Sequence, residues 1–433
     1  LGAGVMGAQL SGHLANAGIP SLLFDISQGL SEQGKANLTS LKPAPLYKPK
    51  NIELITPCSY DDHIDKISEV DWVLEAVAEK LEIKHIVYKN LLPHLKDSAI
   101  ITSNTSGIPL EELISVLPEE VQSRFMITHF FNPPRYMRLL ELVRGTNTSD
   151  EVYNSMAEFG ETTLGKGIVH AKDTPNFIAN RIGIYGMMLT MKLAQEMGLT
   201  VEEVDKITGT IVGRPKSATF RTADVVGLDT MAHVAQTCYD LCEQDEERDI
   251  FQSPEILNKL IEEGRLGAKT KAGFYKKTEK KEILSLDLQT GEYNPQKKVR
   301  FDGFRLAKDH QDTGAKISAM AYSNDKAGKF FWEVLSRSLI YSANRIPEIC
   351  EGIMNVDNAM KWGFGWELGP FEVWDAIGLE RSVTKMQNEE KNIPEWIQNM
   401  ISEDKTYFYE ISDNSRKFYN IPSNNLQPVS SHN

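Results

Sequence analysis

The stretch Leu1–Leu30 reads LGAGVMGAQLSGHLANAGIPSLLFDISQGL. Its glycines Gly2, Gly4 and Gly7 have the G-x-G-x-x-G spacing, and a helical apolar pattern and a short strand ending on Asp25 follow them. This order of turn, helix, strand and acid predicts a dinucleotide-binding unit, in which the glycines shape the turn and the helix N-terminus faces a pyrophosphate. A carboxylate at Asp25 would accept hydrogen bonds from the ribose hydroxyls and repel a 2′-phosphate, which favours NAD over NADP. An ordinary glycine turn is the alternative.

The composition limits the class of protein. The chain has 433 residues, enough for two to four domains, and a formal net charge of −13, which argues against a nucleic-acid partner or an anionic membrane surface. No apolar run approaches the roughly 18 residues of a membrane span. The 4 cysteines are too few and too scattered for a disulfide framework or a zinc site. We expect no bound metal and a reducing, cytoplasmic location. Because the sequence starts on the glycine turn, we interpret it as a fragment that lacks most of the first strand.

Strands and helical patterns alternate after Asp25, which predicts an α/β fold of the Rossmann type with a doubly wound parallel sheet. The predicted strands are residues 52–56, 72–76 and 99–102. Ligand residues of such sheets lie just past the carboxyl ends of the strands. Glu79, Lys84 and the polar run Ser103–Ser106 occupy such positions and are therefore candidate site residues.

A predicted hairpin brings a histidine and a glutamate together. Two apolar runs, 124–131 and 139–143, flank a proline-containing turn, and His129 and Glu141 lie equally far from the turn centre near Arg135. Opposed residues of an antiparallel pair share a face about 5 Å apart, so Glu141 can hold one nitrogen of the His129 ring and leave the other free as a general base. A buried structural histidine is the alternative.

The region after residue 172 is predicted to be helical. We expect a helix that is capped by Asp173 or Thr174 and carries Asn180 about one turn in. Two segments, 213–229 and 363–379, share a glycine-rich entry and an Asp-x-x-Gly-Leu ending, and each follows a Val-Asp pair. This similarity predicts an all-α C-terminal region with a duplicated helical unit.

These patterns predict five segments. They are a dinucleotide-binding domain at 1–172, a first helical domain at 173–280, a polar connection at 281–325, a second helical repeat at 326–390 and a linker-like tail at 391–433.

The motifs GAGVMG, EAVAEKLEIK, SNTS, HFFNPP with LLELV, DTPNFIANR and GRLGAKTKAGFY together resemble the L-3-hydroxyacyl-CoA dehydrogenase family of fatty-acid β-oxidation. The resemblance runs from residue 1 to about residue 276. The duplicated helical unit is similar to the dehydrogenase portion of bacterial bifunctional proteins in which an enoyl-CoA hydratase follows. The resemblance thus implies that such a domain can follow the tail. It also implies either a homodimer or an internal pseudo-dimer, and the duplication favours the internal form.

The resemblance also implies roles for individual residues. His129 matches the catalytic base, Glu141 its orienting partner, and Ser106 and Asn180 the residues that contact the substrate. The positions that match NAD contacts are Gly2, Gly4, Val5, Met6, Gly7, Asp25, Glu79, Lys84, Ser106 and Asn132. One segment departs from the family: the first copy reads GRPKSATFRTAD where the second keeps GPFEVWD, which puts acyl-chain specificity in doubt.

The expected activity is the NAD-dependent oxidation of an (S)-3-hydroxyacyl-CoA thioester to the 3-oxoacyl-CoA. Two alternatives stay open. One is a dehydrogenase of a free hydroxy acid, and the other is a nucleotide-binding scaffold without turnover.

Overall fold

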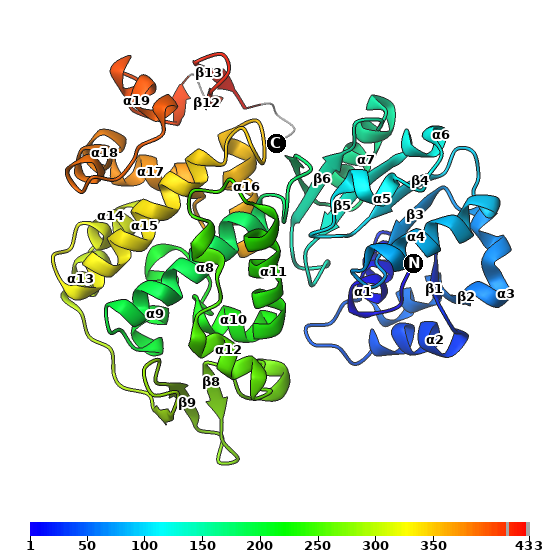
Figure 1. Ribbon diagram of the computed structural model, residues 1–433, viewed down its shortest axis with the longest axis horizontal. Coiled ribbons are helices and arrows are strands. Elements are labelled where there is room, and N and C mark those ends of the chain that lie inside the picture. The colour runs from blue at the N-terminus through cyan, green and yellow to red at the C-terminus, as the bar shows by residue number, and fades with distance from the viewer. Residues whose placement is uncertain (413–414, 430–433) are drawn as a thin grey trace. The chain divides into compact units, whose positions relative to one another are not determined.

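The computed structural model describes residues 1–412 and 415–429 of the chain, which divides into two compact units (Figure 1). Unit 1 is Leu1–Phe177 and unit 2 begins at Ile178. The predicted dinucleotide-binding domain ends at 172, so the observed division falls a few residues later in the chain.

Unit 1 contains a parallel α/β sheet, which confirms the predicted fold class. Its strands fall into two groups, β1–β2 and β3–β4–β5–β6–β7, and all neighbours are parallel except β5 and β6. The strands are β1 (Ser21–Asp25), β2 (Ile55–Ser59), β3 (Trp72–Glu75), β4 (Ile100–Ser103), β5 (Phe125–Phe130), β6 (Leu139–Arg144) and β7 (Gly167–Ala171). The helices are α1 (Val5–Asn16), α2 (Gln28–Asn37), α3 (Tyr60–His63), α4 (Leu81–Leu91), α5 (Leu110–Ile114), α6 (Glu119–Gln122) and α7 (Asp150–Thr162).

One predicted strand is displaced. The run 52–56 was expected to be extended, but Pro49–Leu54 forms a 3-10 helix and β2 starts only at Ile55. Pro49 stands in the first turn of that helix, where its fixed φ and missing N–H are tolerated.

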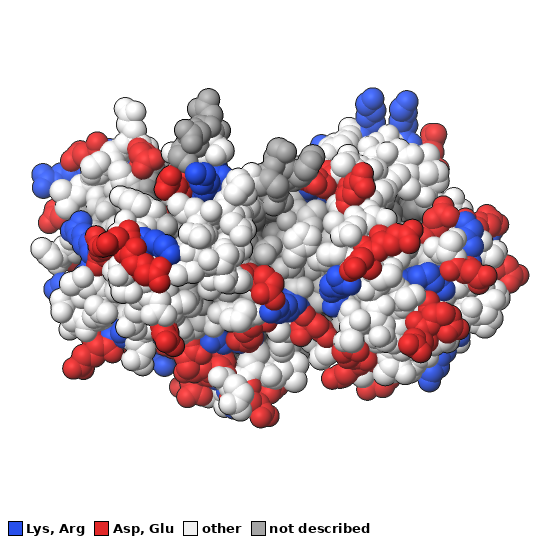
Figure 2. All heavy atoms as spheres, turned by 90° about the horizontal axis from the view of Figure 1, so that it is seen from above, with Lys and Arg blue, Asp and Glu red and all other residues white. Residues whose placement is uncertain are grey.

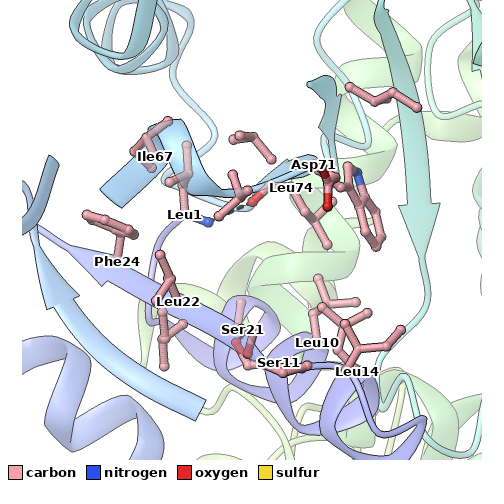
Figure 3. Close-up of a pocket in the computed structure, with 18 of the residues that line it drawn as sticks. Leu1, Leu10, Ser11, Leu14, Ser21, Leu22, Phe24, Ile67, Asp71 and Leu74 are labelled. Carbon is pink, nitrogen blue, oxygen red and sulfur yellow. Dashed lines mark hydrogen bonds between the residues drawn. The ribbon is translucent and has the colours of Figure 1, made fainter. Parts of the chain in front are cut away.

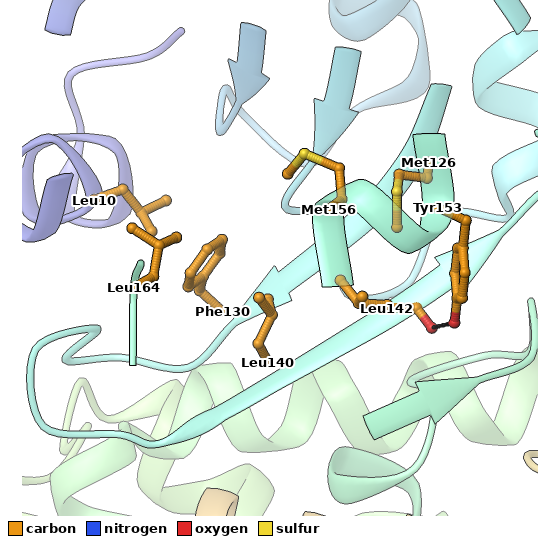
Figure 4. Packing of buried hydrophobic residues seen from close by; sticks show 8 residues of the cluster. All are labelled: Leu10, Met126, Phe130, Leu140, Leu142, Tyr153, Met156 and Leu164. Carbon is orange, nitrogen blue, oxygen red and sulfur yellow. Dashed lines mark hydrogen bonds between the residues drawn. The ribbon is translucent and has the colours of Figure 1, made fainter. Parts of the chain in front are cut away.

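A hydrophobic cluster holds α1 and α7 to the antiparallel pair β5–β6 (Figure 4). Leu10 of α1 and Leu164 after α7 lie at one end of the cluster, and Phe130 and Leu140 come from the two strands. At the other end, the Tyr153 hydroxyl donates a hydrogen bond of 3.5 Å to the Leu142 carbonyl oxygen. The cluster therefore ties the helix that follows the glycine turn to the strands that carry His129 and Glu141.

A cavity of about 850 Å³ separates β1 from β3 (Figure 3). Among the described residues, β1 pairs only with β2 and β3 only with β4. The backbone of Leu1 and Gly2 bridges the carboxyl ends of β1 and β3: the Leu1 nitrogen donates to the Leu74 oxygen at 2.6 Å and Gly2 N–H to the Phe24 oxygen at 2.8 Å. The rest of both facing edges borders the cavity, whose walls include Leu10, Leu14, Leu22 and Leu74.

Unit 2 is helical with two small antiparallel sheets, β8–β9–β10 and β11–β12–β13. Its helices are α8 (Ala179–Glu196), α9 (Val201–Ile207), α10 (Phe220–Val226), α11 (Leu228–Leu241), α12 (Glu255–Glu262), α13 (Asp302–Lys308), α14 (Thr313–Ala321), α15 (Lys326–Asn344), α16 (Ile353–Phe364), α17 (Pro370–Ile377), α18 (Leu379–Asn388) and α19 (Glu395–Ser402). Its strands are β8 (Tyr275–Lys277), β9 (Ile283–Leu286), β10 (Tyr293–Pro295), β11 (Tyr409–Ser412), β12 (Ser415–Asn420) and β13 (Asn425–Pro428).

The two helical copies repeat the same hydrogen bonds. Asp205 accepts the Phe220 N–H at 2.6 Å and the Tyr275 hydroxyl at 2.8 Å, and Asp357 accepts the Phe371 N–H at 2.8 Å and the Tyr409 hydroxyl at 2.7 Å. A second aspartate of each copy accepts two backbone N–H groups. Asp224 binds those of Phe274 and Tyr275, and Asp375 binds those of Phe408 and Tyr409. The duplication therefore extends to single side chains.

This repeat corrects two predicted segments. The tail 391–433 is not linker-like where the structure describes it, because α19 and β11 complete the second copy as α12 and β8 complete the first. The segment 281–325 is more than a connection, since it contains β9, β10, α13 and α14. Polar composition misled both predictions. The helices α14 and α19 each bury only a short apolar set, Ile317 with Met320 and Ile397 with Met400, and β11 is held by Asp375 from an earlier part of the chain.

The start of α8 also differs from the expectation. Neither Asp173 nor Thr174 caps the helix. Its N-cap is Ile178, which makes no side-chain cap hydrogen bond. Asn176 and Phe177 have φ of 62° and 53°, a left-handed conformation that cannot continue into the first turn of a helix. Asp173 instead accepts the Leu110 N–H at 2.9 Å.

The described residues include no helix that is long and apolar enough to cross a membrane, and no group of three or more His, Cys, Asp or Glu side chains arranged to hold a metal ion. On the face that Figure 2 shows, Lys and Arg side chains are interspersed with Asp and Glu and form no continuous basic patch.

His13 of α1 is expected to make unit 1 sensitive to mild acid. Burial, aided by the nearby Lys166 charge, lowers the pKa of His13 to about 4, so the folded chain binds fewer protons here than the unfolded chain between pH 4 and 6.5. Its contribution to stability is full above pH 6.5 and is lost as the pH falls toward 4, a loss of at most about 3 kcal/mol. Denaturant unfolding of the parent chain and His13→Gln across this range measures the effect. Parallel pH profiles would contradict it.

Candidate active site

His129 and Glu141 form a buried pair on neighbouring strands. They lie directly opposite each other in the β5–β6 register, as the hairpin predicts, and the His129 Nδ1 lies 2.7 Å from the Glu141 Oε2. The Glu141 side chain is fully buried and that of His129 is 7% exposed. Because a carboxylate only accepts hydrogen bonds, a neutral His129 beside it carries its proton on Nδ1 and keeps its lone pair on Nε2. The pair therefore has the arrangement that a neutral general base needs.

Two aromatic rings flank the His129 imidazole. The Phe131 ring centroid lies 4.6 Å from that of His129 and the Phe177 centroid 5.4 Å, both at steep interplanar angles of 60° and 59°. Phe177 is 1% exposed, and its left-handed backbone belongs to the segment that ends unit 1. These rings restrict the orientation of the imidazole and keep most water away from it.

The glycine turn fits a dinucleotide pyrophosphate. A Cβ on Gly7 would lie 1.8 Å from the Gly2 carbonyl oxygen, so only glycine allows α1 to approach the turn this closely. A Cβ on Gly4 would meet no atom within 4 Å, and both Gly4 and Val5 are exposed. The first turn of α1 has no acidic residue and no side-chain cap, which leaves its positive end to a ligand.

Asp25 ends β1, next to the glycine turn. Its Oδ2 accepts the Ala3 N–H at 2.7 Å and its Oδ1 the Ile26 N–H at 2.7 Å. The carboxylate is thus fixed beside the turn, and each oxygen keeps a lone pair that can accept a ribose hydroxyl. The residues present therefore fit NAD.

Glu79 organises the loop that carries Ser106. One of its oxygens accepts the Thr105 hydroxyl at 2.5 Å, the Ser106 N–H at 3.0 Å and the Gly107 N–H at 3.2 Å. Although burial opposes it, the Lys84 charge and these hydrogen bonds hold the pKa of Glu79 below its ordinary value. Glu79 therefore stays ionised and fixes the backbone of Ser106, a contact that the sequence pattern did not reveal.

Lys84 lies beneath this loop. Its side chain is 1% exposed, and its Nζ lies 2.8 Å from the Glu75 Oε1 and 3.1 Å from the Glu79 Oε2. Glu75 also accepts the Tyr88 hydroxyl at 2.8 Å and the Ser103 hydroxyl at 2.7 Å. Sequence reasoning missed Glu75, although an acidic residue that ends a buried strand was a usable signal.

The turn after β5 is tied to the glycine-turn helix. Gln9 Nε2 of α1 donates to Asn132 Oδ1 at 2.9 Å, and Asn104 Oδ1 accepts the Phe130 N–H at 2.9 Å. Met6 is half-buried and packs against the cluster of Figure 4. Unit 1 thus brings the predicted residues of the SNTS and HFFNPP motifs to the ends of adjacent strands.

Asn180 is half-buried in the first turn of α8 and belongs to unit 2. Its predicted contact with the substrate stays a prediction.

The chain matches two descriptions of one protein family. Residues 1–174 match "3-hydroxyacyl-CoA dehydrogenase, NAD binding domain", and residues 177–277 match "3-hydroxyacyl-CoA dehydrogenase, C-terminal domain".

Individual proteins show the same similarity. The chain is 44% identical over 440 residues to a probable 3-hydroxyacyl-CoA dehydrogenase of Bacillus subtilis, covering 97% of this chain and 55% of that protein. It is 34% identical over 387 residues to a putative fatty acid oxidation complex trifunctional enzyme of Rickettsia prowazekii, covering 86% of this chain and 52% of that protein. The chain therefore spans about half the length of these relatives.

A solved structure shares the fold over both units. The crystal structure of 3-hydroxybutyryl-CoA dehydrogenase from Escherichia coli matches with a TM-score of 0.69 over 93% of this chain and 98% of that one, at 20% identity. Because its match extends well beyond residue 277, it covers much of the second helical copy as well as the first.

Proposed function

The chain belongs to the 3-hydroxyacyl-CoA dehydrogenase family and contains its NAD-binding domain, and from this we propose that it oxidises an (S)-3-hydroxyacyl-CoA to the 3-oxoacyl-CoA. The observation that carries the proposal is the buried His129–Glu141 pair, in which Nδ1 and Oε2 lie 2.7 Å apart. Neither the glycine turn nor the histidine alone would support this chemistry. The glycine turn supplies a dinucleotide site, and the His129–Glu141 pair supplies a base that can take a hydroxyl proton.

In this reaction, the free Nε2 of His129 takes the proton of the substrate's 3-hydroxyl group. Glu141 holds the ring in the required tautomer and stabilises the imidazolium that forms. Ser106, on the loop that Glu79 fixes, and Asn180, in the first turn of α8, would position the hydroxyl and the thioester. Phe131 and Phe177 restrict water around the imidazole.

Bound NAD supplies the hydride acceptor. Gly2, Gly4, Val5, Met6 and Gly7 would hold its pyrophosphate, and Asp25 its ribose. Glu79, Lys84 and Asn132 are less direct candidates, because each already binds other side chains of the chain. We expect Lys84, which is almost fully buried, to act by fixing Glu79.

The proposal is tested by the loss of NADH absorbance with acetoacetyl-CoA as the oxidant. We expect turnover with the thioester and at least about 100-fold less with free acetoacetate, because the remote part of a substrate supplies binding energy that the reaction uses. Equal rates with both compounds would favour a dehydrogenase of free hydroxy acids. NADH binding without turnover of either would favour a scaffold.

The protein's wider role and its partners are proposals of the same kind. The putative trifunctional relative from R. prowazekii supports a role in fatty-acid oxidation. An enoyl-CoA hydratase domain in the same polypeptide is proposed from the sequence resemblance. We propose an internal pseudo-dimer, since α8 and α15 of the two copies pack together through the stacked rings of Tyr185 and Tyr341, 3.7 Å apart. We also propose a cytoplasmic location, as the sequence predicts.

A further inference from the structure

A buried arginine stands beside Asn180 at the start of α8. The Arg181 side chain is fully buried, its Nη2 lies 2.6 Å from the Asp245 Oδ2, and its Nε donates to the Tyr341 hydroxyl at 2.6 Å. Breaking these contacts would leave a buried charge without a partner, which costs several kcal/mol. The contacts therefore hold the Arg181 side chain in one position. Because consecutive residues of a helix have fixed relative directions, whatever fixes Arg181 also fixes Asn180.

Tyr341 belongs to α15, in the second helical copy. Its hydroxyl accepts from Arg181 and donates to Asp245 Oδ2 at 2.7 Å, which closes a triangle of three buried side chains. Its ring stacks on Tyr185, one turn further along α8, at 3.7 Å and an interplanar angle of 6°. Tyr341 therefore holds the first two turns of α8 at two points.

These contacts lie at the start of α8, a helix that has no side-chain cap. Its N-cap residue Ile178 makes no side-chain cap hydrogen bond, and the two residues before it have left-handed backbones. An uncapped first turn tends to fray, because its N–H groups have no partners within the helix. The Ile182 N–H donates to the Ile178 oxygen at 3.0 Å, a backbone hydrogen bond of this turn.

We propose that Tyr341 is a positioning residue for Asn180. Tyr341 belongs to the second helical copy, which contains none of the proposed reacting groups, and it orders the first turn of α8, which carries Asn180. This inference rests on the proposed function, since it takes Asn180 to contact the thioester substrate. The second copy would then have a role in the reaction and not only in assembly.

The test is Tyr341→Phe, which keeps the stacked ring and removes the hydroxyl. We expect kcat with acetoacetyl-CoA to fall about 10-fold, because a small displacement of a positioning group is costly in the transition state, while the KM for NADH stays unchanged. We also expect hydrogen exchange at the Ile182 amide to become about 10-fold faster, the effect of losing one hydrogen bond to a charged group.

Trp332→Phe is the matched control. Like Tyr341→Phe, it removes a hydrogen-bond donor from a buried aromatic side chain of α15. The lost donor is the Trp332 indole N–H, which donates to Glu389 at 2.7 Å and makes no contact with Arg181. We expect this variant to lose stability without a change in kcat or in Ile182 exchange.

The readouts separate two kinds of failure. Parental kcat and parental Ile182 exchange in Tyr341→Phe would overturn the inference, as would equal effects in Trp332→Phe. Absence of thioester turnover in the parent chain would instead contradict the proposed function, and Ile182 exchange would still decide whether Tyr341 orders the turn.

Discussion

His129→Ala is expected to lower kcat with acetoacetyl-CoA and NADH by about 10²- to 10⁴-fold, the usual contribution of a positioned general acid or base. The variant removes the imidazole and leaves the glycine turn and Asp25 intact, so NADH affinity should stay at the parental value. Steady-state kinetics and NADH fluorescence titration measure the two quantities separately.

The matched control is His310→Ala, which removes an exposed histidine outside the site and should leave both quantities unchanged. Turnover at the parental rate in His129→Ala would contradict the proposed chemistry. Loss of NADH binding would show that His129 supports the fold of unit 1 and that its effect on turnover is indirect.

Gly7→Ala is expected to weaken NADH binding by at least about 10-fold and to lower the free energy of unfolding by about 1–3 kcal/mol, as overpacking does. The added Cβ would lie 1.8 Å from the Gly2 carbonyl oxygen, so α1 must move away from the turn. Denaturant unfolding and NADH titration measure these effects.

Substitutions of two other glycines separate the effect on NADH binding from the effect on stability. Gly4→Ala adds a Cβ in open space beside the turn, so it should weaken NADH binding and leave stability almost unchanged. Gly352→Ala adds a Cβ in open space at the N-cap of α16 in unit 2, the position that Gly4 holds in α1, and should leave NADH binding unchanged. A Gly7→Ala variant that binds NADH as tightly as the parent chain would contradict the pyrophosphate site.

The sequence predicted best where local spacing alone fixes which residues meet. The opposition of His129 and Glu141 follows from two apolar strands joined by a proline-containing turn, because residues equally far from the turn centre face each other in an antiparallel pair. The aspartates Asp205 and Asp357 could be matched from the sequence because each copy keeps the same Val-Asp pair and the same ending.

The sequence predicted less where distant segments determine the structure. No local pattern showed that Glu75 and Glu79 share Lys84, since burial of that lysine depends on β3, α4 and the SNTS loop together. The fold of β11 depends on Asp375, more than thirty residues earlier, which binds the Phe408 and Tyr409 N–H groups. A polar segment of this kind resembles a linker until its partners are known.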